Sequence, residues 1–106
     1  MARRKWQCYI CGDEVVEGQR FTVTGKGFVH LECLYRSVAE KKLSRDIVAY
    51  MDALEVLNYA ITRIKEAEML SETPEAKASL QEARRKLEAE AARITKQLVE
   101  AAGLDQ

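Results

Sequence analysis

Two short pairs of metal-binding residue types stand in the first third of the chain. Cys8 and Cys11 are separated by two residues. His30 and Cys33 have the same spacing, and eighteen residues lie between the two pairs. Thiolates and imidazole are ligands of tetrahedral zinc, and this close pairing is typical of structural zinc sites. The chain has three Cys and one His, and the pattern uses all of them. We therefore predict one zinc ion ligated by three cysteines and one histidine.

The number of ligands argues against other chemistry at these residues. A disulfide between Cys8 and Cys11 would leave Cys33 unpaired, and an iron–sulfur cluster ordinarily requires four thiolates. A catalytic zinc keeps one position open for water, whereas four protein ligands close the shell. The sequence offers no further Cys or His as a nucleophile or base. We expect a structural site and no enzymatic activity.

The residues between the two ligand pairs predict turns and β-structure. Gly12, directly after the second Cys, allows the chain to turn back with a positive φ. A glycine-rich turn at residues 24–27 then lies among β-prone residues, which predicts a short hairpin. We expect Phe21, Val23 and Phe28 to be its buried side chains. A ligand pocket lined by these side chains is the alternative.

Apolar residues recur at helical spacing from residue 31 onward. This places His30 and Cys33 together on the first turn of a helix. A zinc knuckle, a hairpin, and a helix whose start supplies the last two ligands make up the treble-clef arrangement. A unit of about 40 residues buries too little surface to fold alone, so a metal is required. We predict this module over residues 8–43.

Beyond the zinc module the sequence predicts two long helices. Ser44 suits an N-cap, and Thr73 with Pro74 suits the cap and first position of a second helix. We expect an antiparallel helical hairpin, or coiled coil, over residues 44–102 and a short tail at 103–106, which gives a small α+β fold overall. The heptad seam of the first helix is Ile47, Tyr50, Leu54, Leu57, Ile61 and Ile64.

The first of these helices carries more apolar residues than one neighbouring helix can cover. At about 25 cal/mol per Å² of buried apolar surface, leaving several of them exposed forgoes several kcal/mol. The zinc module, a second copy of the chain or a foreign protein could cover them. We predict a homo-oligomer or a protein partner through residues 44–70, with Val48, Met51, Val56 and Tyr59 in the interface. We expect no small-molecule substrate.

Formal charge is distributed unevenly along the chain. Residues 1–45 contain nine Lys/Arg and five Asp/Glu, whereas the remainder carries the opposite excess, so that the total is zero. Residues 1–7 form a basic arm, for which a frayed end and a nucleic-acid contact are both open. In the second case cations would meet phosphates and the indole would stack on a base. The possible contact residues are Arg3, Arg4, Lys5, Trp6, Arg20 and Lys26.

Targeting signals are not evident in the sequence. No run of eighteen apolar residues exists, so we expect no membrane span. The basic start has no apolar stretch behind it and is not a secretory signal. Cysteines at ligand spacing favour a reducing cytoplasm.

The spacing C-x2-C-x18-H-x2-C resembles the first zinc module of LIM domains, although their second module is absent. The run from Cys8 to Gly18 is similar to the start of L24e-type ribosomal proteins, which close their site with Cys instead of His. The whole chain most resembles a family of small archaeal zinc-finger proteins carrying CxxC…HxxC. That resemblance implies zinc and a cytoplasmic archaeal setting, and it implies no activity.

Two functions are consistent with these features. The first is a non-catalytic zinc protein that acts as an interaction or assembly module and self-associates through its helical hairpin. The alternative is an RNA-binding or ribosome-associated protein that uses the basic zinc module.

Overall fold

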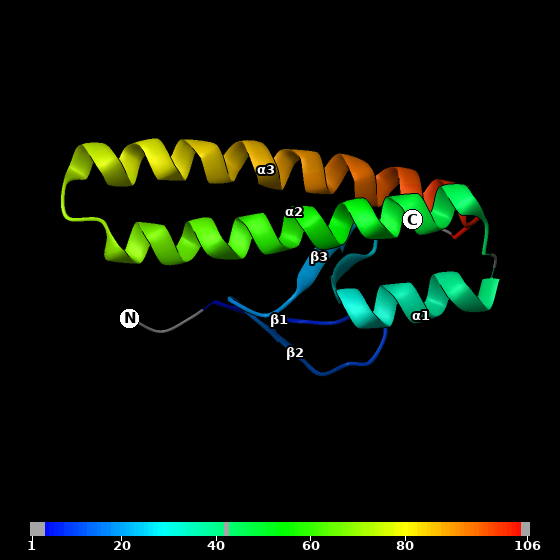
Figure 1. Cartoon of the computed structure of the whole chain (residues 1–106). Helices are drawn as coiled ribbons and strands as arrows, with labels where there is room; N and C mark the ends of the chain where they lie inside the picture. The colour runs from blue at the N-terminus through cyan, green and yellow to red at the C-terminus, as the bar shows by residue number, and fades with distance from the viewer. Residues whose placement is uncertain (1–3, 42, 105–106) are drawn as a thin grey trace.

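The computed structural model describes residues 4–41 and 43–104 of the 106-residue chain. Two small β-hairpins are followed by a short helix and two long antiparallel helices (Figure 1). This confirms a small α+β protein with a helical hairpin. We call residues 4–41 the head. The elements are β1 (Lys5–Gln7), β2 (Glu14–Val16), β3 (Phe21–Thr24), β4 (Gly27–His30), α1 (Leu31–Lys41), α2 (Arg45–Leu70) and α3 (Pro74–Ala101).

The head contains two antiparallel hairpins, β1–β2 and β3–β4, where the sequence predicted one. The additional hairpin is closed by the knuckle itself. The Cys8 N–H donates to the Asp13 carbonyl at 2.9 Å, and the Gly12 N–H donates to the Cys8 carbonyl at 2.9 Å. Gly12 has a φ of 81°, as its place in the turn predicts. Residues 5–7 of the expected basic arm therefore belong to a strand.

An aromatic cluster holds the two hairpins together. The Trp6 ring stacks on Phe28 with centroids 4.3 Å apart and lies 5.5 Å from the Phe21 ring. All three rings are half-buried. The expected burial of Val23 is wrong, since this side chain is 45% exposed. Successive strand residues point to opposite faces. Because the Thr22 side chain points into the protein, that of Val23 points outward.

The long helices begin where their capping residues predict. The Ser44 hydroxyl accepts from the Ile47 N–H at 3.3 Å, and the Thr73 hydroxyl accepts from the Ala76 N–H at 3.1 Å. Pro74 is the first residue of α3, where its missing N–H costs no helical hydrogen bond. No helix of the described part of the chain is long and apolar enough to cross a membrane.

The other end of α3 is closed by a backbone motif. Gly103 has a φ of 72°, and its N–H donates to the Glu100 carbonyl at 3.1 Å. The next N–H, of Leu104, donates to the Val99 carbonyl at 3.0 Å. This is the Schellman arrangement, which satisfies the last free carbonyls of a helix. Leu104 packs against the core, so the predicted tail begins as part of the fold.

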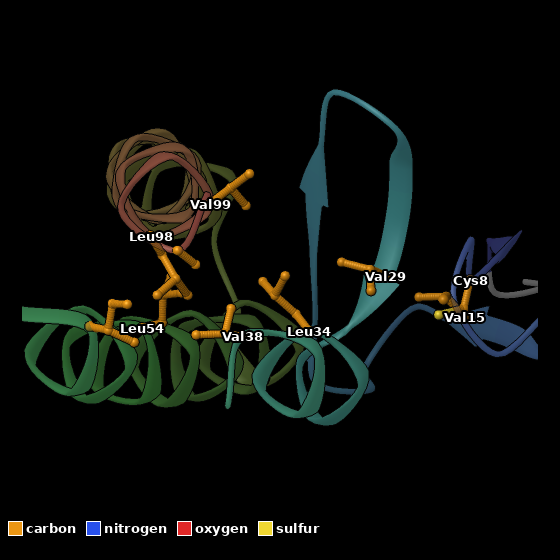
Figure 2. Packing of buried hydrophobic residues seen from close by; sticks show 10 residues of the cluster. Cys8, Val15, Val29, Leu34, Val38, Leu54, Leu98 and Val99 are labelled. Atoms are coloured by element: carbon orange, nitrogen blue, oxygen red, sulfur yellow. The ribbon is translucent and has the colours of Figure 1, made fainter. Parts of the chain in front are cut away.

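One hydrophobic core runs from the helical hairpin into the head. Figure 2 shows Leu98 of α3 and Leu54 of α2 continuing through α1 and β4 towards the knuckle. The head therefore folds back on the hairpin, which is one of the three coverings considered for the apolar surplus of α2. The labelled members of this core are Cys8, Val15, Val29, Leu34, Val38, Leu54, Leu98 and Val99.

A buried pair of hydroxyls joins the head to α3. The Thr22 and Thr95 side-chain oxygens lie 2.8 Å apart, and the Thr95 hydroxyl donates to the Ala91 carbonyl at 2.7 Å. Since that proton is committed to the carbonyl, the Thr22 hydroxyl is the donor within the pair. The chain Thr22–Thr95–Ala91 leaves no hydroxyl proton of the pair unsatisfied.

We predict that Thr95→Val lowers the free energy of unfolding by about 1–3 kcal/mol, because it leaves the buried Thr22 hydroxyl without an acceptor. Adding Thr22→Val should recover part of this loss, since the unpaired hydroxyl is then absent. Denaturant unfolding of metal-loaded protein measures both, with the exposed Ser79→Ala as a control. A double variant that is destabilised by the sum of the two single changes would contradict the prediction.

Candidate metal centre

The four predicted ligands converge at the junction of the two hairpins and α1. Cys8 and Cys11 lie in the turn between β1 and β2, His30 ends β4, and Cys33 lies in the first turn of α1. Their ligand atoms all lie within 4.8 Å of one another. The Nδ1 atom of His30 is 3.4 Å from the sulfur of Cys11 and 3.8 Å from that of Cys33.

These distances fit a single tetrahedral ion. Zinc–sulfur bonds of about 2.3 Å and zinc–nitrogen bonds of about 2.0–2.1 Å place sulfur and nitrogen about 3.5 Å apart in a tetrahedron. The two measured separations from Nδ1 of His30, 3.4 Å and 3.8 Å, lie close to this value. The group can therefore hold one metal ion with four protein ligands.

A backbone carbonyl orients the imidazole. Nε2 of His30 lies 2.9 Å from the carbonyl oxygen of Glu14 in β2. A carbonyl can only accept a hydrogen bond, so Nε2 carries the proton and the lone pair of Nδ1 faces the sulfurs. The sequence predicted His30 as a ligand, but it gave no signal for Glu14, which contributes through its backbone.

The knuckle also places donors around its sulfurs. The N–H of Asp13, the residue after Gly12, points at the Cys11 sulfur over 3.4 Å. The N–H of Tyr9 donates to the Phe28 carbonyl at 3.0 Å, which fixes the knuckle against β4. Backbone hydrogen bonds thus fix the position of the knuckle, with its two cysteines, relative to β4.

Burial and neighbouring groups give Cys8 and Cys33 different pKa values. Burial raises the pKa of Cys8, but hydrogen bonds from backbone N–H groups, first that of Cys11, lower it to about 6. Burial, followed by the neighbouring sulfurs of Cys11 and Cys8, raises the pKa of Cys33 to about 12. Three thiolates this close repel one another, and a bound cation removes that repulsion.

Two of the six possible nucleic-acid contacts are engaged within the protein. The Arg20 guanidinium pairs with Glu32 at 2.6 Å and also with Glu55 of α2. The Trp6 ring is stacked on Phe28. Arg20 therefore fastens the head to α2, and one face of the indole is covered.

The other four residues predicted to contact a nucleic acid are all basic. Arg4, Lys5 and Lys26 are exposed, and the Lys5 ammonium lies 3.9 Å from the Glu14 carboxylate. Arg3 falls outside the described residues.

The four residues predicted for an interface divide into two groups. Val48, Val56 and Tyr59 are exposed on α2. Met51 is half-buried and packs against the core, and its carbonyl accepts a hydrogen bond from the Tyr35 hydroxyl at 3.3 Å. The structure therefore leaves three of the four side chains on one solvent-facing side of the helix.

We predict that His30→Cys retains one metal ion per chain whereas His30→Ala loses it. Nδ1 is the ring nitrogen nearer to Cβ, so a cysteine sulfur reaches about the same point and completes a shell of four thiolates. Alanine leaves three thiolates and an incomplete shell. Metal content after dialysis against a chelator measures this. Full metal content in His30→Ala, or none in His30→Cys, would contradict the assignment of Nδ1 as the ligand.

Comparison with known proteins identifies one family. The model of a family described as "Uncharacterized protein conserved in archaea (DUF2175)" matches residues 4–100, which include the metal centre and most of both long helices. A search of curated proteins gives no match to this chain, and neither does a search of solved structures. The resemblances to LIM domains and to L24e-type proteins therefore remain similarities of ligand spacing. Since the match covers nearly the whole sequence, the chain belongs to this family conserved in archaea.

Proposed function

We propose that this protein is a non-catalytic, zinc-stabilised assembly module that self-associates through α2. The observation that carries the proposal is an exposed apolar surface on that helix, on the side away from the core. We call it the α2 outer face and define it by Val48, Val56, Tyr59 and Leu70, whose exposed fractions are 42%, 68%, 68% and 81%.

The proposed zinc is supported by the donor set. Three thiolates and one imidazole are soft ligands that favour zinc over calcium or magnesium, and four ligands suit a structural site. The head is proposed to be a treble clef, since a knuckle, a hairpin and the start of a helix supply the ligands in that order. Thiolate ligation suits the reducing cytoplasm in which we place the protein.

Helix geometry brings the residues of the α2 outer face together. At about 100° of rotation per residue, its four members fall within an arc of about 80°. Leu54, which is 2% exposed, lies on the opposite side of the helix and packs into the core. The α2 outer face is thus a stripe of exposed apolar side chains, interrupted by the exposed charged residues Asp52, Arg63 and Glu66 on the same side of the helix.

A second copy of this chain fits the stripe better than an arbitrary partner. When two α2 helices pack antiparallel about a two-fold axis at Tyr59, positions at equal distance from Tyr59 face each other. Val48 then meets Leu70 of the second copy, eleven residues on either side. Glu55 meets Arg63 of the second copy, four residues on either side, which places opposite charges together.

One contact in this arrangement is unfavourable. Asp52 faces Glu66 of the second copy, seven residues on either side of the axis. Arg63 lies 3.2 Å from Glu66 within its own chain and reduces this repulsion. The arrangement therefore predicts that one acidic residue weakens the association that the apolar residues favour.

We predict that Tyr59→Glu makes the protein monomeric and that Asp52→Asn tightens the association. The first change places two charges on the two-fold axis, and the second removes a like-charge contact. Sedimentation equilibrium over micromolar concentrations measures both, with Lys86→Glu on the exposed side of α3 as a control. A wild-type protein that stays monomeric throughout this range would defeat self-association, and an unaltered affinity in Asp52→Asn would defeat this pairing.

The RNA-binding alternative has less support. Arg20 is paired with two carboxylates, and Trp6 is stacked within the head. Two of the six residues predicted to contact a nucleic acid are therefore already engaged within the protein. The exposed Arg4, Lys5 and Lys26 are the cations that this alternative retains.

A further inference from the structure

A small cavity lies between β3 and the two long helices. Its volume is about 130 Å³, close to the roughly 150 Å³ of an apolar protein cavity that admits benzene. Leu31 and Leu54, at 1% and 2% exposure, form part of its lining with Ile61. Ala91 of α3 also lines it, and its short side chain leaves room that a larger residue would fill. The cavity is therefore mainly apolar and belongs neither to the metal centre nor to the α2 outer face.

Three of the six polar residues that line the cavity lie on one side of α2. Asn58, Thr62 and Lys65 all line it, and their spacing of four and three residues places them on one face of the helix. The Asn58 amide donates to the Phe21 carbonyl over 3.5 Å, at the limit of a hydrogen bond. An ammonium, an amide and a hydroxyl thus belong to residues that line the same space, and each can donate a hydrogen bond.

Lys65 is the cation of this site. Its ammonium lies 5.8 Å from the centroid of the Phe21 ring, over the ring face. Within residues 4–41 and 43–104, no carboxylate lies within 4.0 Å of it. Glu88 also lines the cavity. The Arg84 guanidinium lies 3.2 Å from its carboxylate and also pairs with Glu68 at 2.6 Å. The cavity therefore presents the Lys65 ammonium beside an apolar volume, with the Glu88 carboxylate also in its lining.

We propose that this cavity binds a small monocarboxylate with a compact apolar body, of about the size of benzoate. The apolar body contacts Leu54 and Ala91, and the carboxylate meets the Lys65 ammonium with the donors of Asn58 and Thr62 beside it. A second negative charge on the ligand would approach Glu88, so the site favours monoanions. Because the cavity is lined from β3, α2 and α3, the bound ligand also fastens the head to the hairpin.

The test is a titration of the metal-loaded, full-length protein with benzoate, followed by NMR of methyl groups. We expect saturable shifts at Leu54, Thr62 and Ala91. Benzamide has nearly the same shape without the charge, and it should bind at least tenfold more weakly, because charge-assisted hydrogen bonds are the stronger kind.

Substitutions test the contribution of the Lys65 charge and that of the cavity volume separately. Lys65→Met keeps an unbranched stem, so it should reduce the benzoate affinity at least tenfold and leave the benzamide affinity unchanged. Lys96→Met, on the exposed side of α3, is the matched control and should bind as the wild type does. Ala92→Leu adds bulk from an exposed lining position and should weaken both ligands. No saturable shift at tens of millimolar benzoate, equal affinity for benzamide, or shifts centred away from the cavity would overturn the proposal.

Discussion

Three sulfur atoms and one ring nitrogen lie within 4.8 Å of one another, and the rest of the head depends on what neutralises them. Without a cation, the thiolates repel and the knuckle, β4 and α1 have no common point of attachment. With one, the two hairpins and the first helix are joined at their ends. The Glu14 carbonyl completes this arrangement, since it fixes the His30 ring through the nitrogen that does not face the sulfurs.

The metal centre and the helical hairpin are parts of one folding unit. A single hydrophobic core connects Cys8, one of the four residues of the metal centre, with Leu98 near the end of α3. The contacts of Arg20 with α2 and of Thr22 with α3 add polar attachments across the same junction. Any ion that binds only the folded head therefore stabilises the helices as well, by mass action. The sequence predicted a zinc module and a separate coiled coil, whereas in the structure the two share one hydrophobic core.

The features predicted from the sequence are those that local chemistry determines. Ligand spacing identified the metal centre, and Ser44 and Thr73 marked the helix starts because a cap needs only its own next three residues. The strand containing Trp6 was missed, since three residues are too few to show a period. The burial of Val23 was predicted wrongly because a strand's inward face depends on what packs against it. Docking of the head on α3 has no local signal at all.

The hydroxyl pair joins positions 22 and 95, and this separation bears on the order in which the protein forms during synthesis. The metal ligands emerge from the ribosome early, and α2 with α3 can pair by local contacts, which form quickly. The surface on which the head packs includes Leu98 and Val99, which come more than sixty residues after the last ligand, Cys33. A nascent head thus has all four ligands before it has a surface to pack against. Completion of the fold waits for the end of α3, so loss of the last two turns of this helix would expose the head as well as shorten a helix.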